Sequence, residues 1–255
     1  MSELLSVALE AAGAATEIVT RMYRSNCAVR LKADKSPVTD ADVAAEQAIR
    51  AVIERRFPRH GFYGEETGKS QADAEFLWVV DPIDGTKAFV REYAMFSTQI
   101  ALMHRGRLIV GVSSAQPYGE LAHAERGEGA WLNGERIRVS AVNHVEEASL
   151  STGNLKSLAR DRARWSRFGE IVTRLDRIRG YGDFLHYHLV ASGRIEGAFE
   201  SDINILDIAA LAMIVEEAGG KVTDLDGAPV SLEMTSILAS NGVMHPTFLE
   251  ALRRG

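Results

Sequence analysis

Hydrophobic spacing predicts two amphipathic helices in the N-terminal part of the chain. Apolar residues recur every three or four positions from Leu4 to Met22, which is the spacing of a helix with one buried face. A second helix is expected to begin at Thr39 and to stop before Pro58. Thr39 and Asp42 fit a capping box at its start, and proline disfavours a helical residue in front of it.

Strands are predicted in the middle of the chain. The run at residues 76–80 is short and apolar throughout, which is typical of a strand buried on both faces. Between residues 95 and 140 the pattern is one of strands and turns, with hairpin turns at 104–107 and 133–134. Antiparallel strands are therefore expected in this region.

The C-terminal part alternates again between helices and strands. Helical stretches are predicted at residues 156–175, 184–191 and 205–218, a strand at 195–199, and a last helix beginning at Pro246. This alternation predicts an α/β fold, a layered sandwich with mixed sheets. We expect one domain over residues 1–255, with a soft division into halves 1–145 and 146–255.

Composition and charge narrow the classes of function. The 255 residues carry 29 basic and 35 acidic side chains, a net charge of −6. An acidic chain without a basic run is a poor candidate for binding nucleic acid or an anionic membrane. We expect no signal peptide and no transmembrane helix, because charges interrupt the apolar stretches. Cys27 is the only cysteine, which fits a reducing cytoplasm, and we interpret it and the histidines as ordinary structural residues.

The most informative segment follows the predicted strand at 76–80 and reads Asp81-Pro82-Ile83-Asp84-Gly85-Thr86. Two acids three positions apart across a tight turn can both reach one cluster of hard cations, which prefer carboxylate and carbonyl oxygens. Gly85 and Thr86 then open a helical segment, whose first N–H groups favour an anion such as phosphate. The alternative is ordinary turn chemistry, since Asp, Pro and Gly are all common in turns.

Three further acids are candidates for the same site, each with a simpler explanation. Glu65, one of two adjacent acids, could belong to a solvated loop. Asp207 lies among apolar neighbours at a predicted helix start, where it could be an N-cap. Asp42 could serve only the capping box with Thr39, although a capped helix end can also present its acid to a site.

Convergence of these acids would require cations. Two like charges ~4 Å apart repel by about 4 kcal/mol at an effective dielectric constant of about 20. A cluster of Glu65, Asp81, Asp84 and Asp207 is therefore tolerable with divalent ions bound. Such ions would also explain how an acidic protein attracts an anionic substrate. Spacing alone does not establish that the acids meet.

The same residues resemble the inositol monophosphatase superfamily of lithium-sensitive, Mg²⁺-dependent phosphatases. Its three signatures match, in order, Gly64-Glu65-Glu66, the Asp81–Thr86 element and the segment from Asp207 through Gly220. The match extends from Lys32 to Gly242 and departs at Leu206, where the family usually has Trp. The resemblance implies an αβαβα fold like that of inositol monophosphatase and fructose-1,6-bisphosphatase, usually as a homodimer.

The resemblance also implies two or three Mg²⁺ ions and their ligands. One ion would be held by Glu65, Asp81 and the Ile83 carbonyl, and a second by Asp81, Asp84 and Asp207. Glu65 would also help to hold a weaker third ion.

Catalytic and phosphate-binding roles follow from the same resemblance. Thr86 and Asp42 would orient and deprotonate a metal-activated water, with Glu65 beside them. The amides of Gly85 and Thr86, next to Asp84, would cradle the phosphate group of a small metabolite.

Within the superfamily, details favour histidinol phosphate as substrate. Residues 87–91, Lys-Ala-Phe-Val-Arg, resemble the histidinol-phosphate phosphatase-like branch. Asp183 and Glu200 together could bind an ammonium group, which histidinol phosphate carries and inositol phosphate lacks; such a contact is worth about 1.5–3 kcal/mol. Asp183 could instead cap the helix after it, and Glu200 could accept hydrogen bonds from inositol hydroxyls.

The resemblance therefore implies a histidinol-phosphatase of histidine biosynthesis, which we expect to be cytoplasmic. An inositol-1-phosphate phosphatase is the second possibility, and a catalytically idle metal-binding homologue is a distant third.

Overall fold

The structure is a computed structural model, and it describes residues 1–25, 28–31 and 37–253. Cys27 lies outside these residues, so its structural role stays a prediction. Residues 32–36, at the start of the predicted family match, also lie outside them.

The larger sheet has eight strands and comes from the N-terminal part of the chain. Its members are β3 (Gly61–Gly64), β4 (Gly68–Ser70), β5 (Phe76–Asp84), β6 (Ser97–His104), β7 (Arg107–Ala115), β8 (Glu120–Glu125), β9 (Gly129–Leu132) and β10 (Glu135–Ile137). The order across the sheet is β10-β9-β8-β7-β6-β5-β3-β4. The β3–β5 pair is parallel and the other pairs are antiparallel, including the predicted hairpins.

The smaller sheet has five strands from the C-terminal part. They are β11 (Ser149–Thr152), β12 (Arg177–Arg179), β13 (Gly197–Glu200), β14 (Lys221–Thr223) and β15 (Ile237–Ser240). Their order is β12-β11-β13-β15-β14, with both parallel and antiparallel pairs, so the prediction of mixed sheets is confirmed. A separate antiparallel pair joins β1 (Val29–Leu31) to β2 (Pro37–Thr39).

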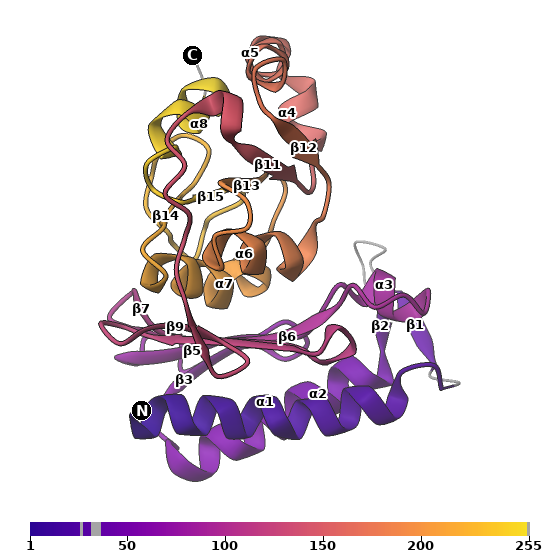
Figure 1. Cartoon of the computed structure of the whole chain (residues 1–255). Helices are drawn as coiled ribbons and strands as arrows, with labels where there is room; N and C mark the ends of the chain where they lie inside the picture. The colour runs from indigo at the N-terminus through magenta and orange to yellow at the C-terminus, as the bar shows by residue number, and fades with distance from the viewer. Residues whose placement is uncertain (26–27, 32–36, 254–255) are drawn as a thin grey trace.

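Helices form three layers around the two sheets (Figure 1). The first layer is α1 (Glu3–Met22) and α2 (Asp40–Arg56), the middle layer is α6 (Asp183–Ala191) and α7 (Ile205–Glu217), and the outer layer is α4 (Lys156–Arg160), α5 (Arg162–Val172) and α8 (His245–Leu252). Short helices α3 (Thr86–Val90), η1 (Gln116–Tyr118) and η2 (Val145–Glu147) complete the chain. The order of layers is helix, sheet, helix, sheet, helix, which confirms the αβαβα sandwich.

Separate apolar cores fill the interfaces on the two faces of the larger sheet. Trp78 and Val80 of β5 pack with the first helical layer, whereas Leu77 and Val79 pack with the middle layer. This alternation explains why the run at 76–80 is apolar at every position. In the part of the chain that the structure describes, no helix combines the length and the apolar character needed to cross a membrane.

Two predicted elements differ from the structure by more than two residues. The strand at 76–80 continues to Asp84 rather than ending before the acids. The helix predicted at 156–175 is broken at Asp161, whose backbone is extended and whose side chain accepts hydrogen bonds from the first turn of α5. An Asp in a helical pattern can thus be an N-cap that starts a new helix.

Candidate active site

A β-bulge in β5 turns Asp81 and Asp84 toward the same face of the sheet. Strand side chains alternate between faces, so residues three apart normally point in opposite directions. Asp81 lies opposite Gln99 and Asp84 lies opposite Ser97, so β5 has one more residue than β6 between these pairs. Both aspartates therefore face the middle helical layer.

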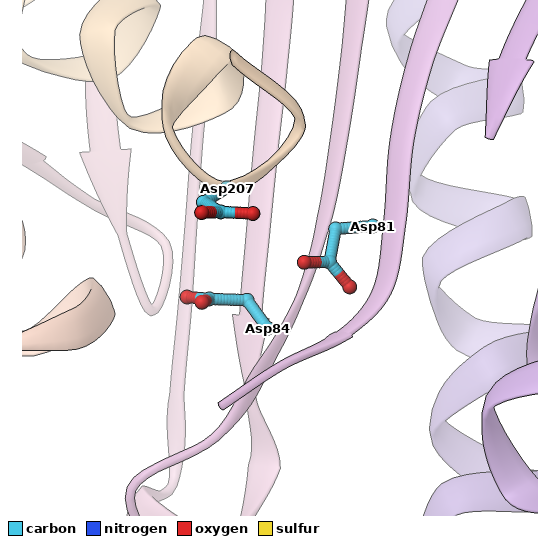
Figure 2. Close-up of side chains that lie close together, drawn as sticks. All are labelled: Asp81, Asp84 and Asp207. Carbon is cyan, nitrogen blue, oxygen red and sulfur yellow. The ribbon is translucent and has the colours of Figure 1, made fainter. Parts of the chain in front are cut away.

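Asp207, in the first turn of α7, meets these two aspartates from the other side (Figure 2). One carboxylate oxygen from each of Asp81, Asp84 and Asp207 lies within 4.8 Å of the others. Asp207 is not the N-cap of α7: that residue is Asn204, whose backbone N–H donates to Asp207 Oδ2 at 3.1 Å in a capping box. Asp207 therefore belongs both to the capping box of α7, as its N3 residue, and to the acidic cluster.

Burial and mutual repulsion disfavour the charged forms of these acids. Burial raises the pKa of Asp81 well above its ordinary value, and the charges of Glu65, Asp207 and Asp84 raise it further. Burial likewise raises the pKa of Asp207 to about 7 and that of Asp84 well above the usual range. An all-oxygen cluster that resists ionisation alone fits a hard divalent cation, which would compensate the charges.

Glu65 is held beside the cluster by a buried acid of α2. The Glu65 backbone N–H donates to Val80 O of β5 at 3.2 Å. Glu46 accepts hydrogen bonds from the N–H groups of Glu66 and Thr67, both at 2.8 Å. A Cβ at Gly64 would lie 2.5 Å from the Glu46 carboxyl carbon, so this position has no room for a side chain. The loop that carries Glu65 is therefore fixed rather than freely solvated.

Sequence reasoning gave Glu46 no role. Its position four residues after Asp42, on the same face of α2, is the signal that could have found it.

The predicted pair of Asp42 and Thr86 is in contact. Thr39 donates to Asp42 Oδ2 from its backbone N–H at 2.7 Å and from its hydroxyl at 2.6 Å. Thr86 Oγ1 lies 3.2 Å from Asp42 Oδ1 and 3.0 Å from the Ile83 carbonyl oxygen. Burial raises the pKa of Asp42, partly opposed by its bonds to Thr39.

The acids and the start of α3 line one cavity of about 320 Å³. Its walls include Glu65, Asp81, Ile83, Asp84, Gly85, Thr86, Lys87, Asn154, Asp183 and Asp207. Gly85 has φ +89°, and a Cβ there would lie 2.5 Å from the Met95 carbonyl oxygen. Only glycine suits this turn, which places the start of α3 in the wall of the same cavity as the acids.

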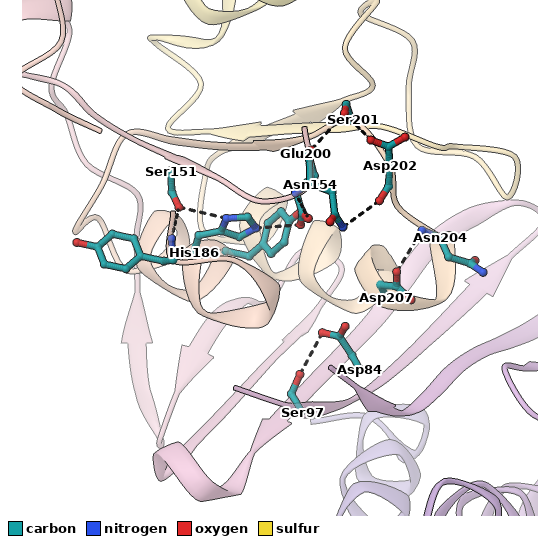
Figure 3. A network of polar contacts seen from close by, with 12 residues as sticks. Asp84, Ser97, Ser151, Asn154, His186, Glu200, Ser201, Asp202, Asn204 and Asp207 are labelled. Atoms are coloured by element: carbon teal, nitrogen blue, oxygen red, sulfur yellow. Dashed lines mark hydrogen bonds and ion pairs between the residues drawn. The ribbon is translucent and has the colours of Figure 1, made fainter. Parts of the chain in front are cut away.

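A smaller recess of about 60 Å³ adjoins this cavity, with Asp84, Asp183 and Glu200 in its wall. Glu200 accepts hydrogen bonds from Tyr187 Oη at 3.0 Å and from the Asn154 backbone N–H at 3.1 Å. His186 Nε2 lies 3.2 Å from the same carboxylate (Figure 3). Burial works against the charged form, but the bonds from His186, Asn154 and Tyr187 outweigh it and lower the pKa of Glu200.

Asp183 enters the recess from the start of α6. Burial, and then the charge of Glu200, raise the pKa of Asp183 to about 6. The N-cap of α6 is Gly182, and no side chain caps this end, so the capping alternative for Asp183 is not what the structure has. Asp183 instead adopts a left-handed φ of +46°.

Three polar residues that bind Glu200 had no predicted role: Asn154 and Tyr187, which line the recess, and His186, which does not. The sequence favours an ordinary structural role for His186, but in the structure this side chain contacts Glu200. Its place three residues after Asp183 on one helix face is a signal that was available. Asn154 and Tyr187 depend on contacts between distant segments, for which the sequence carries no comparable pattern.

Comparisons with known proteins agree with this geometry. A model of the inositol monophosphatase family matches residues 1–255. The chain is 39% identical to the histidinol-phosphatase of Mycobacterium tuberculosis over 257 residues, covering 98% of each protein. It is 35% identical to the inositol-1-monophosphatase of Caulobacter vibrioides over 222 residues, covering 85% of this chain and 87% of that protein. Among solved structures, the extragenic suppressor protein suhB from Bartonella henselae has a TM-score of 0.90 at 32% identity, with 100% of both chains covered.

The two enzyme names denote phosphoric monoester hydrolases, so the prediction of that enzyme class is confirmed. The resemblance expected from the acidic motifs is confirmed as well, and the chain belongs to the inositol monophosphatase family over residues 1–255.

Proposed function

We propose that this chain is a Mg²⁺-dependent phosphatase for a small phosphate ester that carries an ammonium group, specifically histidinol phosphate. The observation that carries the proposal is the pairing of two acidic sites in adjoining cavities. One is the cluster of Asp81, Asp84 and Asp207, and the other is the recess of Asp183 and Glu200.

The cluster is suited to divalent cations because its ligands are buried oxygens that repel one another. Glu65, Asp81, the Ile83 carbonyl, Asp84 and Asp207 would hold the ions. When bound, such ions polarise a phosphoryl group and lower the pKa of a coordinated water.

Asp42 would accept the proton of the attacking water, and Thr86 would transfer it. The two bonds from Thr39 occupy Asp42 Oδ2 and leave Oδ1 toward Thr86. The Thr86 hydroxyl lies between Asp42 and the Ile83 carbonyl, so it can orient a water and pass its proton to Asp42. A carboxyl with a raised pKa is a better base near neutral pH than an ordinary aspartate.

The start of α3 would hold the phosphate group. Backbone N–H groups in the first turn of a helix have no partner within it and favour anions. Gly85, Thr86 and Lys87 line the cavity at this point, and Lys87 adds a positive side chain.

The recess supports an ammonium-bearing substrate. Glu200 is held as a carboxylate by its hydrogen bonds, and Asp183 lies beside it. Among the residues that the structure describes, the lining of the recess includes no arginine or lysine. A substrate cation would relieve the repulsion between the two acids, as the effect of Glu200 on the pKa of Asp183 indicates. The similarity to a histidinol-phosphatase agrees with this choice.

The deciding experiment compares kcat/KM for histidinol phosphate and inositol-1-phosphate in the native protein and in Glu200→Gln. The native protein should prefer histidinol phosphate. Loss of one charge-assisted contact of about 1.5–3 kcal/mol should lower its kcat/KM by about 10–100-fold in the variant. Hydrolysis of the neutral inositol ester should fall by less than about threefold, because Gln keeps a hydrogen-bonding oxygen.

The control is Asp202→Asn, at a residue that does not line the recess. This variant should leave kcat/KM unchanged for both esters. Equal native kcat/KM for both esters would refute the choice of substrate. Absence of Mg²⁺-dependent phosphate release from either ester would refute the proposed chemistry.

Inositol-1-phosphate is the second candidate. Glu200 could accept hydrogen bonds from ring hydroxyls, and the chain is similar to an inositol-1-monophosphatase as well. The homodimer, the cytoplasmic location and the division into two halves near residue 145 stay predictions.

A further inference from the structure

A line of buried polar side chains crosses the core between the larger sheet and α6 and ends at Asp84. Ser97 Oγ donates to Asp84 Oδ2 at 3.4 Å (Figure 3). Gln99 Nε2 lies 2.7 Å from Ser97 Oγ and 3.1 Å from Ser113 Oγ of β7. Ser113 Oγ in turn contacts His188 of α6.

The far end of this line is Glu120 on β8. His188 Nε2 lies 2.9 Å from Ser113 Oγ, and His188 Nδ1 lies 2.8 Å from Glu120 Oε2. Ser97, Gln99, Ser113 and His188 are all at most 2% exposed. The line therefore joins a partly exposed acid to the acidic cluster through the interior of the protein.

The chemistry of the groups sets the direction of the hydrogen bonds between Gln99 and Asp84. Glu120 at one end, and Asp84 at the other end when a bound cation keeps it ionised, are carboxylates that can only accept. The bond from His188 lowers the pKa of Glu120, which keeps that end a carboxylate. A line that ends in two acceptors must reverse its direction once, at a group that donates to both sides. The Gln99 amide NH₂ is that group, because it has two hydrogens and contacts both serines.

The polar line is unusual for its location. Ala101 and Met103, which follow Gln99 on the same face of β6, belong to the apolar core under the middle helices. Burying an amide, two hydroxyls and an imidazole there disfavours folding unless each finds partners. An apolar line would have packed against α6 without that penalty.

We infer that Ser97 and Gln99 are positioning residues for Asp84. Gln99 donates to Ser97 Oγ, which directs the Ser97 hydroxyl hydrogen to Asp84 Oδ2. This bond fixes the orientation of the Asp84 carboxylate toward Asp81 and Asp207. The inference rests on the proposed function, since it takes the cluster as the Mg²⁺ site.

The test measures Mg²⁺ binding to metal-free protein by calorimetry for the native chain, Ser97→Ala and Ser113→Ala. Both serines are buried and accept from Gln99 Nε2, but only Ser97 reaches Asp84. Ser97→Ala should raise the Kd for Mg²⁺ about tenfold, as loss of a hydrogen bond to a metal ligand does. Ser113→Ala should change the Kd for Mg²⁺ by less than about twofold. Both serine variants should shift the unfolding midpoint of the metal-free protein by a similar amount. Gln99→Met should raise the Kd for Mg²⁺ by about threefold, an effect between those of the two serine variants.

Equal Mg²⁺ affinities in the two serine variants would overturn the inference, because general loosening of the core would then explain both. Unchanged affinity in Gln99→Met would overturn the assignment of Gln99. The proposed function is checked separately with Asp81→Asn. Mg²⁺ binding that this variant leaves intact would place the ion elsewhere and refute the proposed function itself.

Discussion

Asp81 is 2% exposed and lies among other acids, so its charge opposes folding of the metal-free protein. We expect Asp81→Asn to lower Mg²⁺-dependent phosphate release by at least about a hundredfold, because it removes a ligand from the cluster. The same change should leave the free energy of unfolding in EDTA unchanged or raise it by about 1 kcal/mol, since it relieves repulsion.

Phosphate release and urea unfolding measure the two effects. The exposed Asp176 offers a matched control, because Asp176→Asn removes the same charge away from the site. Turnover near the native rate in Asp81→Asn would exclude Asp81 as a ligand.

At the scale of elements, the tight turn between β5 and α3 depends on one glycine. Gly85→Ala would put a Cβ 2.5 Å from the Met95 carbonyl oxygen at a φ of +89°. We expect the free energy of unfolding to fall by about 2–4 kcal/mol and activity to fall with it.

Gly119→Ala separates backbone strain from collision in that prediction. Gly119 also has a positive φ, +71°, but nothing lies within 4 Å of its Cβ position. This variant should lose only about 1 kcal/mol in urea unfolding and keep its activity. Equal losses in the two variants would show that the contact with Met95 is unimportant.

The start of α5 provides a second prediction at this scale. Asp161 accepts from the N–H groups of Ala163 and Arg164, both at 3.1 Å. Asp161→Ala should lower the free energy of unfolding by about 0.5–2 kcal/mol without changing kcat/KM, because α5 lies in the outer layer.

Asp161→Ser restores a capping oxygen and should recover most of the stability lost in Asp161→Ala. Thermal unfolding of both variants checks this. Loss of stability in Asp161→Ser equal to that in Asp161→Ala would argue against a capping role.

Elements with local signals were predictable from the sequence. Periodic spacing and the capping box at Thr39 placed α1 and α2, and the acids at 81 and 84 were recognised by their spacing. The continuation of β5 to Asp84 was not, because its bulge exists only through pairing with β6. The hold of Glu46 on the Glu65 loop likewise depends on two segments meeting in space.

At the scale of the whole molecule, the acidic cluster links stability to pH. Folded pKa values of about 7 for Asp207 and about 6 for Asp183 exceed the ordinary value of 3.8, and Asp81 and Asp84 shift in the same direction. Between about pH 4 and 7 these four acids therefore bind more protons in the folded state than in the unfolded state, and their contribution to stability falls as pH rises. His60, His123 and His245, whose pKa values burial lowers, contribute in the opposite sense.

Relative to Mg²⁺-saturated protein, metal-free protein should accordingly lose on the order of 2 kcal/mol of unfolding free energy between pH 5 and pH 7.5, because the histidines contribute equally to both. Urea unfolding with EDTA and with Mg²⁺ at the two pH values measures this difference. An equal pH dependence of stability with EDTA and with Mg²⁺ would contradict the origin assigned to the pKa shifts of the acids.

The cluster also spans a seam in the architecture. Asp81 and Asp84 come from the larger sheet, and Asp207 comes from a helix packed on it from the C-terminal part of the chain. A cation coordinated by all three aspartates would link the larger sheet to α7, so that any displacement of the helix along the sheet would break the coordination. We therefore expect Mg²⁺ to slow amide hydrogen exchange most where α7 packs on the larger sheet. A chain in which this helix has not yet packed on the sheet should be unable to retain the ion.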